Sequence, residues 1–166
     1  MPMRLWHGLR LVMLCASLLG GAVPASALTV CTVGATALAF GSVSSLSSTA
    51  ATSTATIAVS CTTTLAALAA VPYTLSMGVS TTSGTMTRSL AGLLGARLNY
   101  NVYTTVAYSS VWGDGSAGTS QVSGSVTPTT LAIPVTASHT AYGKVPLPQV
   151  VTPGSYADSM TVTVNY

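Results

Sequence analysis

The feature that most constrains the fold of this chain is a two-residue alternation of apolar and polar side chains. The alternation is clearest near the end, where Tyr156, Met160, Val162, Val164 and Tyr166 share one phase and mainly small or polar residues take the other. A period of two places alternate side chains on opposite faces of a β-strand, whereas an amphipathic helix requires a period of about 3.6. The segment 156–166 is therefore predicted to be a half-buried strand.

The same pattern recurs along the chain without a convincing helical period. Further strands are expected over residues 57–61, 71–77, 98–103 and 131–135, while the short segment 65–70 comes nearest to a helical pattern. Serine-, threonine- and glycine-rich stretches separate the strands. Many short strands joined by turns predict one all-β domain, an antiparallel sandwich of the immunoglobulin type.

The first 27 residues are interpreted as a secretion signal and not as part of the domain. Two arginines precede an apolar run over residues 11–22, and Ala25-Ser26-Ala27 follows as a small-x-small cleavage site. The apolar run is too short for a membrane-spanning helix, which needs roughly 20 residues. We expect cleavage between Ala27 and Leu28, which leaves residues 28–166 as a single exported domain.

Export to an oxidising compartment determines the redox state expected of the cysteines. Cys15 leaves with the signal, so Cys31 and Cys61 remain as a pair in an oxidising compartment, where a disulfide is the expected state. Two buried free thiols are the alternative. A disulfide would close a loop of about 31 residues and stabilise the fold by roughly 3.7 kcal/mol in the chain-entropy model. A metal site is not expected, because His139 is the only histidine left to join these two residues.

Charged side chains are scarce and make up 4% of the chain. Beyond residue 27 they are Arg88, Arg97, Lys144, Asp114 and Asp158. The lack of a basic patch argues against a nucleic-acid partner. It also leaves the surface without the charge that normally keeps soluble domains apart. We therefore expect the domain to be buried in an assembly or escorted by another protein.

The same scarcity leaves no convincing catalytic set, so neither an enzyme nor a cofactor is expected. The chain has no glutamate and no Gly-x-Ser-x-Gly elbow. Residues 113–118 match a dinucleotide-binding fingerprint, but no helical pattern follows, which favours a plain loop. Asp114 and Asp158 lie beside turns or strand starts, where a carboxylate usually accepts hydrogen bonds from backbone amides. Tyr156 is similar to the tyrosine corner of sandwich domains.

Motifs spread over residues 28–166 resemble the spore coat protein U domain family, the subunits of archaic chaperone–usher pili. The matching segments are Cys31-Thr32-Val33, Leu38-Ala39-Phe40-Gly41, Ile57–Cys61, Arg88, Leu98–Tyr103, Val111–Gly115, Tyr142–Pro146, Pro153–Asp158 and Val162–Tyr166. The resemblance implies an incomplete immunoglobulin-like sandwich that lacks its last strand and exposes a hydrophobic groove. Trp112, Gly113, Asp114, Tyr156 and Asp158 would form structural motifs, and the groove would be lined by Met160, Val162, Val164 and Tyr166.

The resemblance also implies partners and a location. A periplasmic chaperone would fill the groove first, and at an outer-membrane usher a strand from another pilin subunit would replace it. The chain would then be exported to the periplasm and displayed at the cell surface in a fimbrium or coat, with a role in adhesion or biofilm formation. Only Leu28, Thr29 and Val30 would precede Cys31, and three residues span about 10 Å. That is too short to fill a groove, so an acceptor-only subunit at the tip, or a minor subunit, is expected.

Two other functions are compatible with the same residues. The chain could be a single-domain surface adhesin, in which exposed Tyr108 and Trp112 near the glycine-rich loop bind a sugar or a surface. It could also be a protective layer protein of the spore-coat type. Co-purification with a chaperone would separate an assembly subunit from a free-standing binding module.

Overall fold

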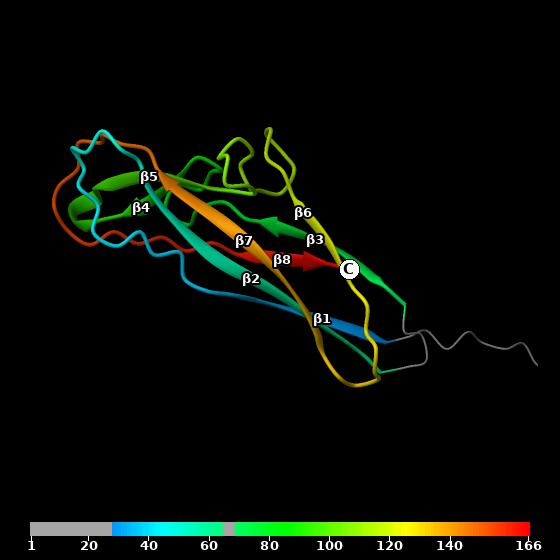
Figure 1. The fold of residues 1–166 in the computed structure, drawn as a ribbon. Coiled ribbons are helices and arrows are strands. Elements are labelled where there is room, and N and C mark those ends of the chain that lie inside the picture. The colour runs from blue at the N-terminus through cyan, green and yellow to red at the C-terminus, as the bar shows by residue number, and fades with distance from the viewer. Residues whose placement is uncertain (1–27, 65–68) are drawn as a thin grey trace, which may run out of the picture.

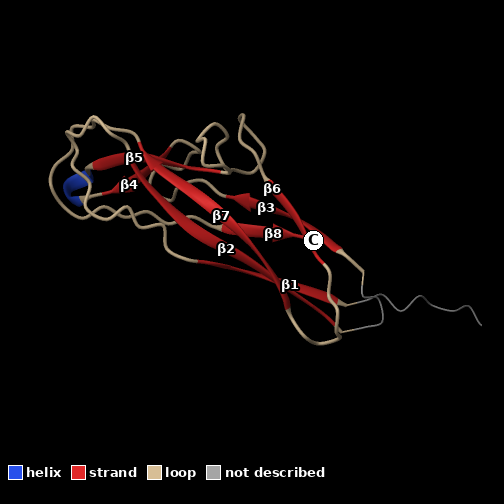
Figure 2. Cartoon of the chain, in the orientation of Figure 1, coloured by secondary structure: helices blue, strands red, loops and turns tan. Residues whose placement is uncertain are grey.

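The computed structural model describes residues 28–64 and 69–166. The predicted signal and its cleavage site at Ala27, and most of the helical candidate 65–70, lie outside the described residues. The described part contains the strands β1 (Thr29–Ala35), β2 (Ala51–Thr63), β3 (Val71–Met77), β4 (Arg88–Ala91), β5 (Arg97–Tyr103), β6 (Val122–Val126), β7 (Val135–Val145) and β8 (Val162–Asn165), and a 3-10 turn, η1 (Leu93–Gly95) (Figures 1 and 2).

The strands form two antiparallel sheets that pack as a sandwich. Five strands pair in the order β1-β2-β7-β5-β4, and three pair in the order β6-β3-β8. The two sheets lie over one another along the long axis of the molecule (Figure 1). The predicted all-β sandwich of the immunoglobulin type is confirmed.

Alternate residues of the strands meet between the sheets, as a period of two requires. The long strand β2 turns every second side chain inward and leaves mainly threonines outside, although Thr63 at its end is buried. The buried apolar residues of the strands come from both sheets and include Ile57, Val59, Leu75, Met77, Leu98, Val102 and Val145.

The predicted disulfide between Cys31 and Cys61 is confirmed. The two residues lie directly opposite each other in the β1–β2 ladder, with Cα atoms 4.1 Å apart and sulfurs bonded at 2.06 Å. Both side chains face the core. The bridge therefore fixes the edge strand β1 on β2.

Two strand predictions were partly wrong. In the stretch 131–135, Leu131 and Ile133 are exposed, and the strand β7 begins only at Val135. In the stretch 156–166, only Val162–Asn165 forms a ladder. The reason is that the preceding backbone bonds to three different places. Ala157 and Ala91 exchange two hydrogen bonds, the Thr81 amide donates to the Ser159 carbonyl, and the Gly78 amide donates to the Thr161 carbonyl.

A buried arginine joins the ends of several strands. The Arg88 guanidinium is fully buried and donates to the Asn101 side chain at 2.7 Å and to the carbonyls of Gly78 and Trp112, both at 2.8 Å. Burial lowers the pKa of Arg88, while the nearby Tyr100 and Asp158 act in the opposite direction. These bonds satisfy carbonyl groups just where the ladder of β3 ends.

One side of the sandwich is closed by a contact between the sheets. The Tyr73 hydroxyl of β3 lies 2.8 Å from Nε2 of His139 on β7, and the two rings meet edge to face at 5.8 Å. Tyr73 reaches across β6 because its partner there is Gly124, where a Cβ would stand 2.6 Å from the hydroxyl. The two sheets are thus held together along the side of β6 and β7.

Candidate functional site

The opposite side of the sandwich has two strand edges that face each other without pairing. β8 is the outer strand of one sheet and β1 is the outer strand of the other, and the two lie close together. Beyond these strands, within the described residues, no backbone-to-backbone hydrogen bond involves residues 37–43 or 150–156. Apart from the carbonyls of Ala39 and Thr152, which accept hydrogen bonds from the side chains of Ser53 and Tyr156, the backbone groups along both edges are therefore available to another strand.

Half-buried hydrophobic side chains follow the same two edges. On the β1 side they are Val33, Leu38, Phe40 and Val43, and on the β8 side they are Val151, Tyr156, Met160, Val162 and Val164. Each packs on the core with one side while the other remains accessible. We call the space between residues 33–46 and 151–164 the edge groove.

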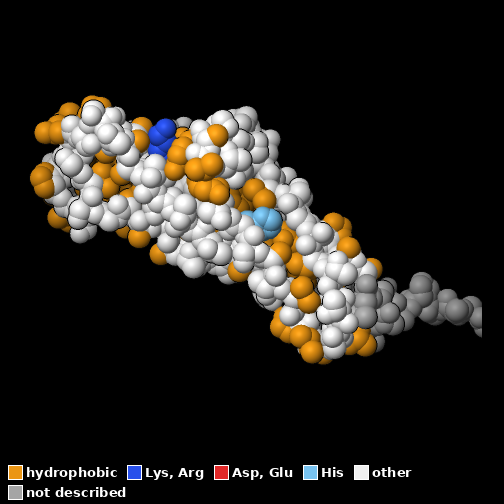
Figure 3. Space-filling model, in the orientation of Figure 1, with side chains coloured by type: hydrophobic (Ala, Val, Ile, Leu, Met, Phe, Trp, Pro, Cys, Tyr) orange, Lys and Arg blue, Asp and Glu red, His pale blue; other side chains and the backbone are white. Residues whose placement is uncertain are grey.

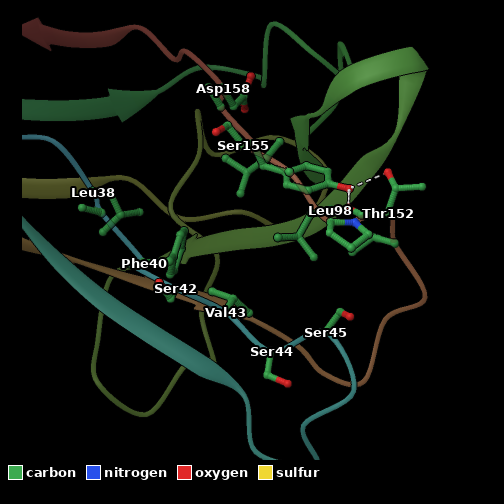
Figure 4. Close-up of a pocket in the computed structure, with 18 of the residues that line it drawn as sticks. Leu38, Phe40, Ser42, Val43, Ser44, Ser45, Leu98, Thr152, Ser155 and Asp158 are labelled. Carbon is green, nitrogen blue, oxygen red and sulfur yellow. Dashed lines mark hydrogen bonds between the residues drawn. The ribbon is translucent and has the colours of Figure 1, made fainter.

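The edge groove widens into a cavity of about 840 Å³ at the end away from the disulfide. Leu90 of β4 and Leu98 of β5 lie at its floor. Figure 4 shows Leu38, Phe40 and Val43 along one wall, with Ser155 and Asp158 across from them. Such a cavity has room for several side chains of an inserted segment.

One wall of the groove is positioned by a glycine. A Cβ on Gly143 of β7 would stand 2.6 Å from Leu38 Cδ2 and 2.9 Å from Phe40 Cζ. Both side chains therefore lie directly over the backbone of β7. Phe40 also meets the ring of Tyr100 edge to face, with 5.9 Å between centroids. The loop after β1 is thus fixed to the five-stranded sheet although it has few backbone bonds of its own.

Asp158 anchors the other wall. Its carboxylate accepts hydrogen bonds from the Tyr100 hydroxyl at 2.8 Å, the Thr82 amide at 3.2 Å and the Thr81 hydroxyl at 3.1 Å. Burial alone raises the pKa of Asp158, but hydrogen bonds from side chains and backbone N–H groups outweigh it and lower the pKa below its usual value. Burial and the bond to Asp158 raise the pKa of Tyr100. The carboxylate therefore stays ionised and ties the 151–158 segment to the 80–82 turn.

The remaining predicted site residues occupy different places. Tyr156 donates its hydroxyl hydrogen bond to the Thr152 carbonyl at 2.6 Å, which pins the same wall (Figure 4). Asp114 accepts bonds from the amide and hydroxyl of Ser116 in its own turn, and these bonds lower its pKa. At Gly113 the side chain of Thr119 leaves no room for a Cβ.

The alternative adhesin function required Trp112 to be an exposed binding residue, and this was wrong. The indole is fully buried and donates from Nε1 to the Leu75 carbonyl at 3.1 Å. Burial of a large ring with a satisfied N–H is the stable solution here, because the ring contributes a large apolar area to the core. Tyr166, named as a groove residue, is 56% exposed at the end of β8, whereas Met160, Val162 and Val164 are half-buried in the groove wall.

The titratable residues do not come together in the described part of the chain. His139 is bonded to Tyr73, Asp158 to Tyr100, and Asp114 to Ser116. Within residues 28–64 and 69–166 no group of three His, Cys, Asp or Glu residues is arranged to hold a metal ion. None of the helices in that part is long and apolar enough to cross a membrane.

Sequence reasoning missed the β1-side wall of the groove, formed by Leu38, Phe40 and Val43, and also Val151 opposite. These residues lie in segments that do not pair as regular strands, and a search for strand patterns therefore did not select them. The apolar residues at 38, 40 and 43, just before the serine-rich stretch, were the available signal.

Comparisons with known proteins agree with this geometry. The family model described as the Spore Coat Protein U domain matches residues 21–163. No curated protein matches the chain. A solved chain from the chaperone–tip adhesion subunit pre-assembly complex of archaic chaperone-usher Csu pili of Acinetobacter baumannii is similar in fold, with a TM-score of 0.52 and 18% identity. The similarity covers 84% of this chain and 40% of that one, so the present chain spans less than half of that relative's length.

Proposed function

Because the chain belongs to the Spore Coat Protein U domain family, we propose that it is a structural subunit of a surface pilus or coat and acts by accepting a β-strand from a partner. The observation that carries the proposal is the edge groove, where two unpaired strand edges border a line of half-buried hydrophobic side chains. This function requires no catalytic group and no cofactor.

An inserted strand would supply the backbone hydrogen bonds and the apolar contacts that both walls of the groove lack. Its backbone would pair with the free N–H and C=O groups of β8 or of the β1 side, and every second side chain would enter the groove. Fully burying a side chain of the size of valine, leucine or phenylalanine stabilises by about 1.5–3 kcal/mol. Several such side chains in the 840 Å³ cavity would make the domain considerably more stable when filled than when empty.

The partners follow from this joint. A periplasmic chaperone would hold the groove after export, an outer-membrane usher would bring the next subunit, and another pilin would donate the lasting strand. Support comes from the relative of similar fold, which was solved in a chaperone complex before assembly. The low charge of the surface is consistent with a chain that is escorted and then packed into a fibre.

Two substitutions in β8 test the groove. Val164 is half-buried on the groove side, whereas its neighbour Thr163 is exposed on the opposite face. Val164→Glu is expected to abolish co-purification of the chain with its chaperone, because a carboxylate would be buried without a partner. Thr163→Glu adds the same charge and should leave co-purification intact.

The outcomes separate groove binding from loss of folding. Formation of the Cys31–Cys61 disulfide in the Val164→Glu chain shows whether the β1–β2 pair still assembles. Equal recovery of both variants with the chaperone would contradict the groove. Isolation of the unaltered chain as a stable, cooperatively folding monomer without any partner would also contradict the proposal.

We further propose that the subunit lies at a fibre tip or in a minor position and has a role in adhesion or biofilm formation. Thr29 and Val30 are already paired with Thr63 and Thr62 of β2, so they are not free to fill a neighbour's groove. Cleavage after Ala27 would leave only Leu28 ahead of them. Mass spectrometry of the mature N-terminus checks the cut, and immunogold labelling along the whole fibre would argue against the tip position.

A further inference from the structure

Three half-buried tyrosines and a lysine gather on the outer face of the five-stranded sheet, on the side of β7 that faces away from the core. Tyr103 of β5 lies directly opposite Tyr142 of β7, and Lys144, two residues on, lies opposite Asn101. The loop after β5 brings Tyr108 onto Tyr103, edge to face at 5.4 Å. Lys144 Nζ lies 5.1 Å from the centroid of the Tyr108 ring.

Polar groups in this tyrosine–lysine cluster are free to bind. The hydroxyls of the core tyrosines Tyr73 and Tyr100 are occupied by His139 and Asp158. In the described part of the chain the hydroxyls of Tyr103, Tyr108 and Tyr142 have no protein partner, and none of them is a buried unpaired atom, so they reach solvent.

Lys144 is a cation without a counter-ion among the described residues. The chain has two acidic residues, and both are bonded elsewhere, Asp158 to Tyr100 and Asp114 to Ser116. The space-filling view of this face shows basic atoms bordered by hydrophobic side chains and shows no acidic group (Figure 3). Charge complementarity therefore calls for an anionic ligand.

The surroundings of the cluster are a flat surface of hydroxyl groups. In the next strand, Thr52 lies opposite Lys144 and Thr54 lies opposite Tyr142, and both threonines are exposed. Tyrosine provides rigid contact area at low entropic cost, and small hydroxyl residues provide adaptable hydrogen bonds, a combination typical of recognition surfaces. A protein partner would instead need a broad interface with an apolar centre.

The backbone at Tyr108 determines where its ring lies. Its φ of 52° lies in the left-handed region, which costs a residue other than glycine about 1–2 kcal/mol. The conformation is held by a hydrogen bond from the Tyr108 amide to the Thr105 carbonyl at 3.1 Å, and it places the ring between Tyr103 and Lys144. The turn therefore holds the Tyr108 ring in one position on the outer face of the sheet.

We propose that the tyrosine–lysine cluster binds an acidic saccharide, with the carboxylate of the sugar on Lys144 and an apolar ring face on Tyr108 and its neighbours. A sugar ring combines C–H groups that stack on an aromatic ring with hydroxyls that bond to Thr52, Thr54 and the free tyrosine hydroxyls. The cluster lies outside the edge groove, so the ligand and an inserted strand can be bound at the same time, and neither requires the other.

Calorimetric titration of the full chain, in the partner-bound form in which it is recovered, tests the proposal with an oligogalacturonate and its methyl ester as probes. The acid should bind about fivefold more tightly than the neutral ester at low salt, and the preference should fade as salt screens the charge. Lys144→Gln should remove the preference, while Arg97→Gln, which removes an equal charge elsewhere, should keep it. Tyr108→Leu should weaken both probes about tenfold.

Equal binding of acid and ester, or equal effects of Lys144→Gln and Arg97→Gln, would overturn the role of the lysine. Binding of a hexaglutamate peptide as tightly as the oligogalacturonate would overturn the choice of a saccharide. If neither the oligogalacturonate nor its methyl ester bound, the proposed site would be rejected. Unchanged thermal unfolding of each variant shows that lost binding reflects the surface and not the fold, and none of these results bears on the edge groove.

Discussion

Reduction of the Cys31–Cys61 bridge should destabilise the whole domain and not only the strand that carries it. The bridge joins residues 30 apart in sequence and holds β1, a wall of the edge groove, on β2. Without the bridge the unfolded chain regains the freedom of a loop of about 31 residues, which favours unfolding by about 3.7 kcal/mol.

This loss is large compared with the stability of an ordinary domain. A stability of about 5–15 kcal/mol is typical, so the reduced form would lose between about a quarter and three quarters of it. An amide that exchanges only through global unfolding should then exchange about 500-fold faster. The slowest amides of β3 and β5 are the ones to follow, because alternate residues of these strands are buried and neither strand pairs with β1 or β2, which carry the cysteines.

Hydrogen exchange followed by mass spectrometry reports on these strands even when a partner is bound. Oxidised and reduced samples of the same preparation are compared, and thiol labelling confirms the redox state of Cys31 and Cys61. A Cys61→Ala, Cys31→Ala chain serves as a second route to the open form. If the slowest amides of β3 and β5 accelerated less than about tenfold, equivalent to about 1.4 kcal/mol, the reasoning from loop closure would be refuted.

Three further changes probe single contacts. Gly124→Ala should cost about 1–3 kcal/mol by overpacking, since its Cβ would meet the Tyr73 hydroxyl; Ser123→Ala, at the exposed neighbour, should be almost neutral in urea unfolding. Burial lowers the pKa of His139, so the folded protein binds a proton at this residue less readily than the unfolded chain does. The free energy of unfolding should therefore be at its full value above about pH 6.5 and should fall as the pH drops from there to the lower pKa of the folded state. His139→Gln should remove that slope. Asp158→Asn should lower the free energy of unfolding by about 1–2 kcal/mol at pH 7, because it weakens the bond to Tyr100. Since the pKa of Asp158 is lowered in the folded state, the difference between the two chains should shrink as the pH falls below about 4. An equal difference at pH 7 and pH 3 would contradict this.

The sequence pattern predicted strands well where large apolar residues alternate, as in Val71–Met77 and Leu98–Tyr103. It missed the middle of β7, although this strand lies at the centre of its sheet. The inward positions there include Ala141 and Gly143, and Gly143 is small because Leu38 and Phe40 lie on it. A strand that is buried under residues from a distant loop needs no bulky side chains, so no alternation is visible.

The site was harder to predict than the fold because it depends on contacts between segments far apart in the chain. Met160, Val162 and Val164 could be named from their period, but the wall opposite them comes from residues that follow β1. The buried position of Arg88 was not evident either, because its acceptors include backbone carbonyls of Gly78 and Trp112, and every residue type offers a carbonyl. The buried indole of Trp112, which the alternative adhesin function had exposed, also donates to a backbone carbonyl, that of Leu75.

The Tyr73–His139 contact has a consequence for the energetics of strand insertion. It holds the two sheets together along one side, while the disulfide holds β1 on β2 within the five-stranded sheet, so both contacts limit how far the groove walls can move when a strand is inserted. Walls that are held in this way lose less conformational freedom on binding than mobile walls do, and more of the contact energy appears as affinity. The same rigidity makes the groove selective by size. A strand with side chains too bulky for the cavity cannot widen it, and one with side chains too small leaves voids.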